Sequence, residues 1–151
     1  MGGPSFEALK GFLEGAEAAR RAARPLSPAA EVGLRLDGAP ARFQAPGGRP
    51  AVLDEAPRDP DFTLDLPPAA VARLVALPPG DVGALGVAFF ELVLTRDPAA
   101  RVGVRLHAST PRLISRGWLG VLAQGGLQVG LYLLRKGAAN PKAAIDRLRR
   151  R

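Results

Sequence analysis

Two stretches of this chain contain no charged residue, Val82–Phe90 and Gly117–Leu134, and they constrain its fold more than any other feature. A helix that is apolar on most of its sides is either buried in the protein or covers a ligand. A chain of 151 residues needs a core, but two such segments could supply more apolar surface than one core uses. The pattern therefore favours a module that holds an apolar molecule, and an enzyme is the second interpretation.

The length and composition are those of one globular domain. A chain of 151 residues buries roughly 70% of its unfolded surface when it folds. That burial is enough to stabilise a core without disulfides or other cross-links. The chain contains no cysteine, so neither a disulfide nor a thiolate nucleophile or metal ligand is available. Its N-terminus lacks the basic and apolar regions of a secretory signal. We therefore expect a single domain over residues 1–151, located in the cytoplasm.

The first half of the chain predicts one helix followed by four strands. Ser5 is a suitable N-cap, and apolar residues at helical spacing predict a helix over residues 5–24, which Pro25 and Pro28 end. In the part that follows, polar and apolar residues alternate, which predicts strands over residues 32–36, 41–45, 51–55 and 61–66. In the last of these strands, Asp61 takes a polar position.

The second half is mostly helical. Its pattern predicts a short helix over 69–77 and then an apolar helix over 82–94 that is capped by Asp81. A fifth strand follows over 102–108. The next helix is predicted over 110–136, with its start at Thr110-Pro111 and a kink at Gly125 and Gly126, and a basic helix over 141–151 ends the chain. Strands come first and helices gather late, which is the order of an α+β domain rather than of alternating βαβ units.

Several segments resemble the sterol carrier protein type 2 family. An early strand, VGLRLDG, leads into a hairpin, and DFTLDL at Asp61–Leu66 stands before the short helix of Pro67–Leu77. The run GDVGALGVAFFELVL then precedes RVGVRLHAS, which is similar to the final strand of the family. The likeness covers about residues 32–136 and rests on element order and apolar spacing, without a catalytic signature.

This resemblance implies a mixed, curved five-stranded sheet with helices packed over one face and an apolar tunnel between sheet and helices. Such a tunnel would hold a fatty acid, an acyl-CoA or a sterol-like lipid, with no cofactor. The candidates for its lining are Phe62, Leu64, Leu85, Phe89, Phe90, Val104, Leu106, Trp118 and Leu122.

Four aromatic residues allow both a ligand-binding and a structural interpretation. Phe89 and Phe90 are adjacent, so on a helix one ring can enter the core while the other faces a cavity; the simpler interpretation is that both pack in the core. Trp118 and Tyr132 are the only residues of their kinds in the chain. An apolar body with a polar tip suits the rim of a pocket, a membrane interface or partial burial between helix and sheet.

The sequence contains no pattern typical of catalysis or of metal binding. His107 is the only histidine, and strand alternation places it on the solvent face beside Arg105. No nucleophile elbow and no nucleotide-binding glycine loop is present. One histidine without cysteine does not build an ordinary zinc site. We therefore expect a protein that is not an enzyme and that holds neither a metal nor a cofactor.

The uncharged run of Gly117–Leu134 approaches the shortest length that spans a bilayer, since it contains 18 residues. Its five glycines, together with Gln124 and Gln128, disfavour insertion. A helix is also needed to cover the predicted sheet. We expect this segment to lie on the protein rather than in a membrane.

The positive charge is concentrated in the last part of the chain. Residues 1–110 carry 12 basic and 13 acidic side chains, whereas residues 111–151 carry nine basic side chains and one acidic. This asymmetry suggests an anionic partner, and the candidates for docking on an anionic membrane are Lys142, Arg147, Arg150 and Arg151. A solvated tail would explain the same charges. Nucleic acid is a weaker alternative, because no stacking aromatic residues stand beside the arginines.

The interpretation that accounts for most of these features is a carrier domain for an apolar small molecule or lipid. One alternative is a protein–protein interaction module with the same fold, in which the protein's own side chains fill the core. Another is nucleic-acid binding through residues 135–151. The sequence leaves the ligand and the oligomeric state open.

Overall fold

The computed structural model describes residues 3–124, except for the side chains of Leu122 and Gln124. It has the predicted α+β architecture, with a five-stranded sheet that is not closed. The elements in chain order are α1 (Pro4–Gly15), α2 (Glu17–Ala23), β1 (Glu31–Leu36), β2 (Ala39–Gln44), η1 (Pro46–Gly48), β3 (Ala51–Leu53), β4 (Phe62–Leu66), α3 (Pro68–Val75), α4 (Val82–Leu94), β5 (Gly103–Leu106), α5 (Thr110–Ser115) and α6 (Trp118–Gln124).

The sheet has the strand order β3-β2-β1-β4-β5. β1 lies at its centre, antiparallel to β2 and parallel to β4, and β5 is antiparallel to β4. The register sets Leu34 of β1 beside Leu64 of β4, and Leu64 beside Val104 of β5. Because side chains alternate along a strand, these apolar residues share one face of the sheet.

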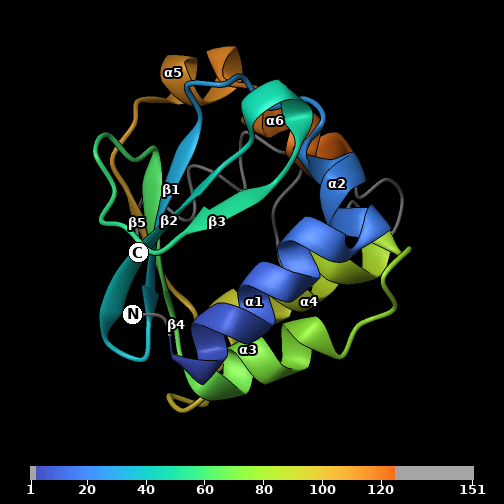
Figure 1. Ribbon diagram of the computed structural model, residues 1–151, viewed down its shortest axis with the longest axis vertical. Helices are drawn as coiled ribbons and strands as arrows, with labels where there is room; N and C mark the ends of the chain where they lie inside the picture. Colours follow the sequence, from blue (N-terminus) through green and yellow to red (C-terminus); the bar gives the residue numbers. More distant parts are fainter. Residues whose placement is uncertain (1–2, 125–151) are drawn as a thin grey trace.

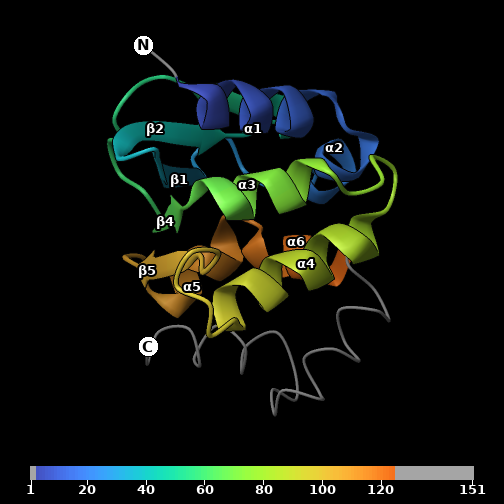
Figure 2. The same ribbon diagram turned by 90° about the horizontal axis from the view of Figure 1, so that it is seen from below.

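The three longest helices of the described part, α1, α3 and α4, lie on that apolar face. Figure 1 shows α1, α3 and α4 together on one side of the sheet, and Figure 2 shows α3 between α1 and α4. Leu9 of α1, Val71 of α3 and Val93 of α4 are buried in the same core as Val52 of β3. The core therefore forms between one layer of strands and one layer of helices, as expected for this class.

The first helix is shorter than the sequence predicted. Ser5 is not its cap but lies in its first turn, where its hydroxyl donates to Oδ1 of Asp37 over 3.0 Å. The helix ends at Gly15 because Ala16 adopts an extended conformation, and α2 begins after it. The backbone N–H of Ala18 donates to the carbonyl of Pro79 over 2.7 Å, a contact with a distant segment that local spacing does not reveal.

The helix predicted over residues 110–136 is wrong in its continuity, since it is broken after Ser115. Gly117 has a φ of +94°, and a Cβ at this position would lie 2.0 Å from the carbonyl oxygen of Pro25. Only glycine tolerates both the left-handed backbone and the close approach. The side chain of Ser109, one residue before the predicted start, caps α5. The predicted kink at 125–126 and the basic helix over 141–151 lie outside the described residues.

Within residues 3–124, no helix combines the length and the apolar character that crossing a membrane requires. The larger part of the uncharged run that begins at Gly117 lies beyond Gln124 and is not described.

Candidate functional site

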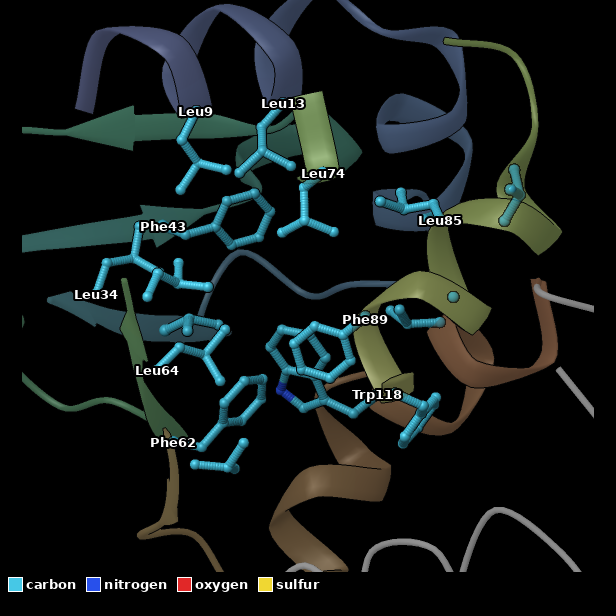
Figure 3. Close-up of a pocket in the computed structure, with 18 of the residues that line it drawn as sticks. Leu9, Leu13, Leu34, Phe43, Phe62, Leu64, Leu74, Leu85, Phe89 and Trp118 are labelled. Carbon is cyan, nitrogen blue, oxygen red and sulfur yellow. The ribbon is translucent and has the colours of Figure 1, made fainter. Parts of the chain in front are cut away.

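A cavity of about 280 Å³ lies between the apolar face of the sheet and the helices, and it is partly open to solvent. Figure 3 shows Leu34 and Leu64 of the sheet on one side and Leu85 and Phe89 of α4 on the other. Among the described residues, no charged or hydroxyl-bearing side chain lines it. The lining residues are Leu9, Leu13, Ala22, Val32, Leu34, Phe43, Phe62, Leu64, Leu66, Leu74, Val82, Leu85, Gly86, Phe89, Phe90, Val104, Leu106, Leu113, Trp118 and Val121.

The structure places eight of the nine candidate tunnel residues around this cavity, and the ninth, Leu122, has a side chain outside the described set. The sequence did not indicate the contributions of Leu9, Leu13 and Ala22, which come from α1 and α2. The sequence shows that these residues are apolar and recur at helical spacing. It does not show which interior surface the helix will face, because a local pattern contains no information about the packing partner.

Helix α4 forms one wall of the cavity through residues at positions i, i+3, i+4, i+7 and i+8, which lie on one side of a helix. The helix has the predicted bounds, and Oδ1 of its predicted cap, Asp81, accepts a hydrogen bond from the backbone N–H of Ala84 over 2.9 Å. The cap fixes where the helix starts and so fixes which residues face the sheet. These wall residues are Val82, Leu85, Gly86, Phe89 and Phe90.

Phe89 and Phe90 both line the cavity, so the interpretation that they only pack in the core is too simple. Phe90 is buried and Phe89 is half-buried. Their rings meet edge to face, with 5.6 Å between the ring centroids, which is a favourable aromatic geometry. The pair therefore makes a continuous aromatic surface on the α4 side of the cavity.

Trp118, the first residue of α6, also lines the cavity, and its side chain is held by two contacts. Its ring packs edge to face on Phe62 with 4.8 Å between the centroids. Its indole Nε1 donates a hydrogen bond to Oδ2 of Asp61 over 2.8 Å. The polar tip of Trp118 is thus satisfied inside the protein rather than at a membrane interface.

Asp61 is fully buried, although the alternation of the sequence gave it a polar position on a strand. Its Oδ1 accepts from Nη1 of Arg116 over 2.6 Å, and its Oδ2 accepts from the backbone N–H of Glu31 over 3.2 Å in addition to Trp118. A buried carboxylate needs such partners to remain charged. Asp61 therefore joins the starts of β1 and β4 to the segment that carries Trp118.

A second ion pair lies beside this carboxylate at the surface. Nη2 of Arg112 donates to Oδ2 of Asp59 over 2.6 Å. That hydrogen bond lowers the pKa of Asp59 below its usual value of 3.8, and the same contact raises the pKa of Arg112. Arg112 and Arg116 are two of the nine basic residues of the C-terminal part, so intramolecular carboxylates neutralise this share of the basic excess.

The single histidine lies away from the cavity, on the opposite face of the sheet. His107 is exposed, and its Nε2 is 2.8 Å from Oγ1 of Thr63. This matches the predicted position on the solvent face. Within residues 3–124, no three His, Asp or Glu side chains are grouped so that they could hold a metal ion.

The docking candidates Lys142, Arg147, Arg150 and Arg151, as well as Tyr132, lie outside the described residues. No protein-family model, no curated protein and no solved structure matches the chain. The resemblance to the sterol carrier protein type 2 family therefore stays a prediction.

Proposed function

We propose that this protein binds an apolar small molecule or lipid in the cavity between its sheet and helices and acts as a carrier rather than as an enzyme. The observation that supports this most directly is the lining, in which every residue that the structure describes is apolar. Each methylene group that leaves water for such a site contributes roughly 0.8 kcal/mol to binding. For binding of this kind the protein only has to enclose a hydrocarbon, and no chemical step is required.

The volume of the cavity supports the same function on energetic grounds. Unfilled apolar space beside a core is unfavourable, because the residues around it lose packing contacts. An apolar ligand in the cavity would supply those contacts. A core filled by the protein's own side chains, which the interaction-module alternative requires, leaves no such space.

The basic end of the chain suggests how a carrier could reach its ligand. Seven of the nine basic residues in 111–151 follow the described part, and each basic residue near an anionic membrane contributes about 1 kcal/mol of attraction. We propose transient docking on anionic lipid as the loading step. Flotation with vesicles tests it: binding should require anionic lipid, should weaken with salt and should be lost on truncation after Gly137. Binding to neutral vesicles of equal strength would contradict this loading step.

The first test of the ligand-binding function uses native mass spectrometry of protein purified without detergent, followed by organic extraction. We expect a bound lipid in the extract. The protein also carries its own reporter, because Trp118 is the only tryptophan of the chain and lines the cavity. Titration of the apo protein with a fatty acid should therefore change the tryptophan emission in a saturable manner. A clean apo mass together with an unchanged emission would overturn the proposal.

A matched pair of glycine substitutions separates binding in the cavity from adsorption elsewhere. Gly86 lies in the middle of the lining stripe of α4, so Gly86→Leu directs a side chain into the cavity. Gly11 lies on α1, where an added Cβ meets no atom within 4 Å, so Gly11→Leu adds the same group to open solvent. Both changes favour helix formation by up to about 1 kcal/mol. Only Gly86→Leu should abolish uptake, and equal uptake by both variants would place the ligand elsewhere.

A further inference from the structure

Trp118 differs from the other lining residues in the described part of the chain, because none of their side chains carries a hydrogen-bonding group. The indole N–H of Trp118 is bonded to Asp61, a carboxylate with no exposed surface. Rotation of the indole would leave this acceptor short of a donor, and loss of a hydrogen bond to a buried charge is costly. Phe62 supports the ring from the side. The wall that Trp118 forms is consequently rigid, whereas leucine and valine side chains elsewhere can change rotamer at little cost.

Trp118 also packs against buried residues outside the main core. The indole packs in a small cluster around Ala108 and Leu113, which are 1% and 2% exposed. Leu113 itself lines the cavity and is fixed by the capped helix α5. The indole thus fills space next to this cluster, and its removal would free that space for a hydrocarbon in the cavity.

The volume and the lining together restrict the chemical class of the ligand. At about 280 Å³ the cavity is slightly smaller than the roughly 300–1,000 Å³ of sites that enclose drug-sized molecules. Within residues 3–124, no lining side chain offers a polar partner to a hydroxyl, amide or charged group, since Nε1 of Trp118 already donates to Asp61. An unpaired buried polar group is unfavourable. The enclosed part of the ligand is therefore a slender hydrocarbon, and its polar head has to stay at the solvent-open side.

We infer that the cavity takes one unbranched hydrocarbon chain, tail first, and that Trp118 determines how long a chain it accepts. The inference rests on the proposed binding function and adds the ligand class and the residue that limits it. Lipids with two acyl chains and fused-ring sterols are disfavoured by size. Removing the indole should open space toward Ala108 and Leu113, so that longer or bulkier hydrocarbons enter.

The experiment compares the affinities of saturated fatty acids from octanoic to stearic acid, and of a fluorescent sterol, in the wild type and in Trp118→Ala. Displacement of a fluorescent fatty acid serves as the readout, since it does not depend on the tryptophan. The preferred chain should be longer in Trp118→Ala, and the affinity ratio of long to short acid should rise about fourfold for each additional methylene enclosed. Trp118→Phe keeps most of the ring and should change the preference little.

Ile114→Ala is the matched control, because Ile114 is an exposed residue of the neighbouring helix α5 and does not line the cavity. It should leave the chain-length profile unchanged. If Trp118→Ala does not fold, Trp118→Leu carries the same comparison with less loss of packing. A thermal unfolding transition of each variant, recorded first, establishes which one is used.

The outcomes separate the two proposals. A wild type that binds no fatty acid of any length and no sterol overturns the proposed function. A wild type that binds, with the same chain-length profile in the Trp118 variants, overturns the role of Trp118 alone. Sterol binding by the wild type as tight as that of the best fatty acid overturns the single-chain ligand class. A longer preferred chain in Trp118→Ala with an unchanged Ile114→Ala supports the inference in full.

Discussion

The indole nitrogen of Trp118 donates a 2.8 Å hydrogen bond to Asp61, and this contact joins the wall of the cavity to a fully buried carboxylate. The two residues are 57 positions apart in the chain. Arg116 donates to the other oxygen of the same carboxylate over 2.6 Å. The candidate binding site and one of the principal polar contacts of the fold thus share a residue, so changes to Asp61 should affect stability before they affect ligand preference.

Asp61→Ala should be strongly destabilising. It leaves the half-buried Arg116 without its main partner and removes the acceptor of Trp118, and breaking a buried ion pair typically costs about 3–5 kcal/mol. Urea unfolding should show this loss in the free energy of unfolding. Asp65→Ala is the control, because Asp65 is an exposed residue of β4, which begins directly after Asp61; it should change stability by less than about 0.5 kcal/mol. Equal effects of the two variants would contradict the role given to Asp61.

Gly117→Ala should destabilise the protein far more than its small size suggests. The left-handed backbone at φ +94° costs a non-glycine residue about 1–2 kcal/mol, and the new Cβ would overlap the carbonyl of Pro25. Gly11→Ala is the matched control. It lies in α1 with open space around it, so it should stabilise by about 0.5–1 kcal/mol. Thermal unfolding of both variants should shift the melting temperature in opposite directions, and a tolerated Gly117→Ala would mean that the contact with Pro25 is not formed.

Glu14 should make stability depend on pH in the acidic range. Burial opposes ionisation of its carboxyl, but hydrogen bonds from Lys10 and from the backbone N–H of Val52 outweigh this and lower its pKa below the usual 4.5. A group whose pKa is lower in the folded state stabilises the fold above its unfolded pKa and loses that contribution as pH falls through the folded pKa. The stabilising contribution should therefore be present above about pH 4.5 and should be lost progressively as the pH falls from there through the lowered pKa of folded Glu14.

The comparison of wild type with Glu14→Gln in urea unfolding at a series of pH values measures this effect. The wild type should be the more stable protein near neutral pH, and the two stabilities should converge as the carboxyl becomes protonated. Because the side chain is about one third exposed, the difference should be modest and should shrink in high salt. A difference that stays constant from neutral to acidic pH would contradict the assignment to Glu14.

The ion pair between Arg73 of α3 and Glu91 of α4 should contribute little to stability, although it links the cavity wall to its neighbouring helix. Both side chains are largely exposed, at 51% and 43%, and exposed pairs contribute about 0–1 kcal/mol. A double-mutant cycle with Arg73→Ala and Glu91→Ala should give a coupling in this range that decreases with salt. A coupling above about 2 kcal/mol, insensitive to salt, would show that the pair is shielded from solvent.

The sequence by itself determined the features that depend on neighbouring residues. Helix α4 was predicted with its observed bounds because an Asp81 cap and an uninterrupted apolar run act within one or two turns. The strand patterns around Leu34, Leu64 and Val104 were readable because alternation alone assigns a side chain to a face. Four candidates for the lining, Phe62, Leu64, Val104 and Leu106, lie on those strand faces, whereas the idea that they line a tunnel came from the family resemblance.

Only the tertiary structure decided the features that depend on segments distant in the chain. The break at Gly117 follows from the approach of Pro25, and the burial of Asp61 follows from Arg116 and Trp118 closing over it. The contribution of Leu9 to the lining likewise depends on where α1 packs. Periodicity indicates that a surface is buried, but not what lies opposite. Whether the space between two apolar surfaces is filled or left as a cavity is a matter of the volumes that meet there.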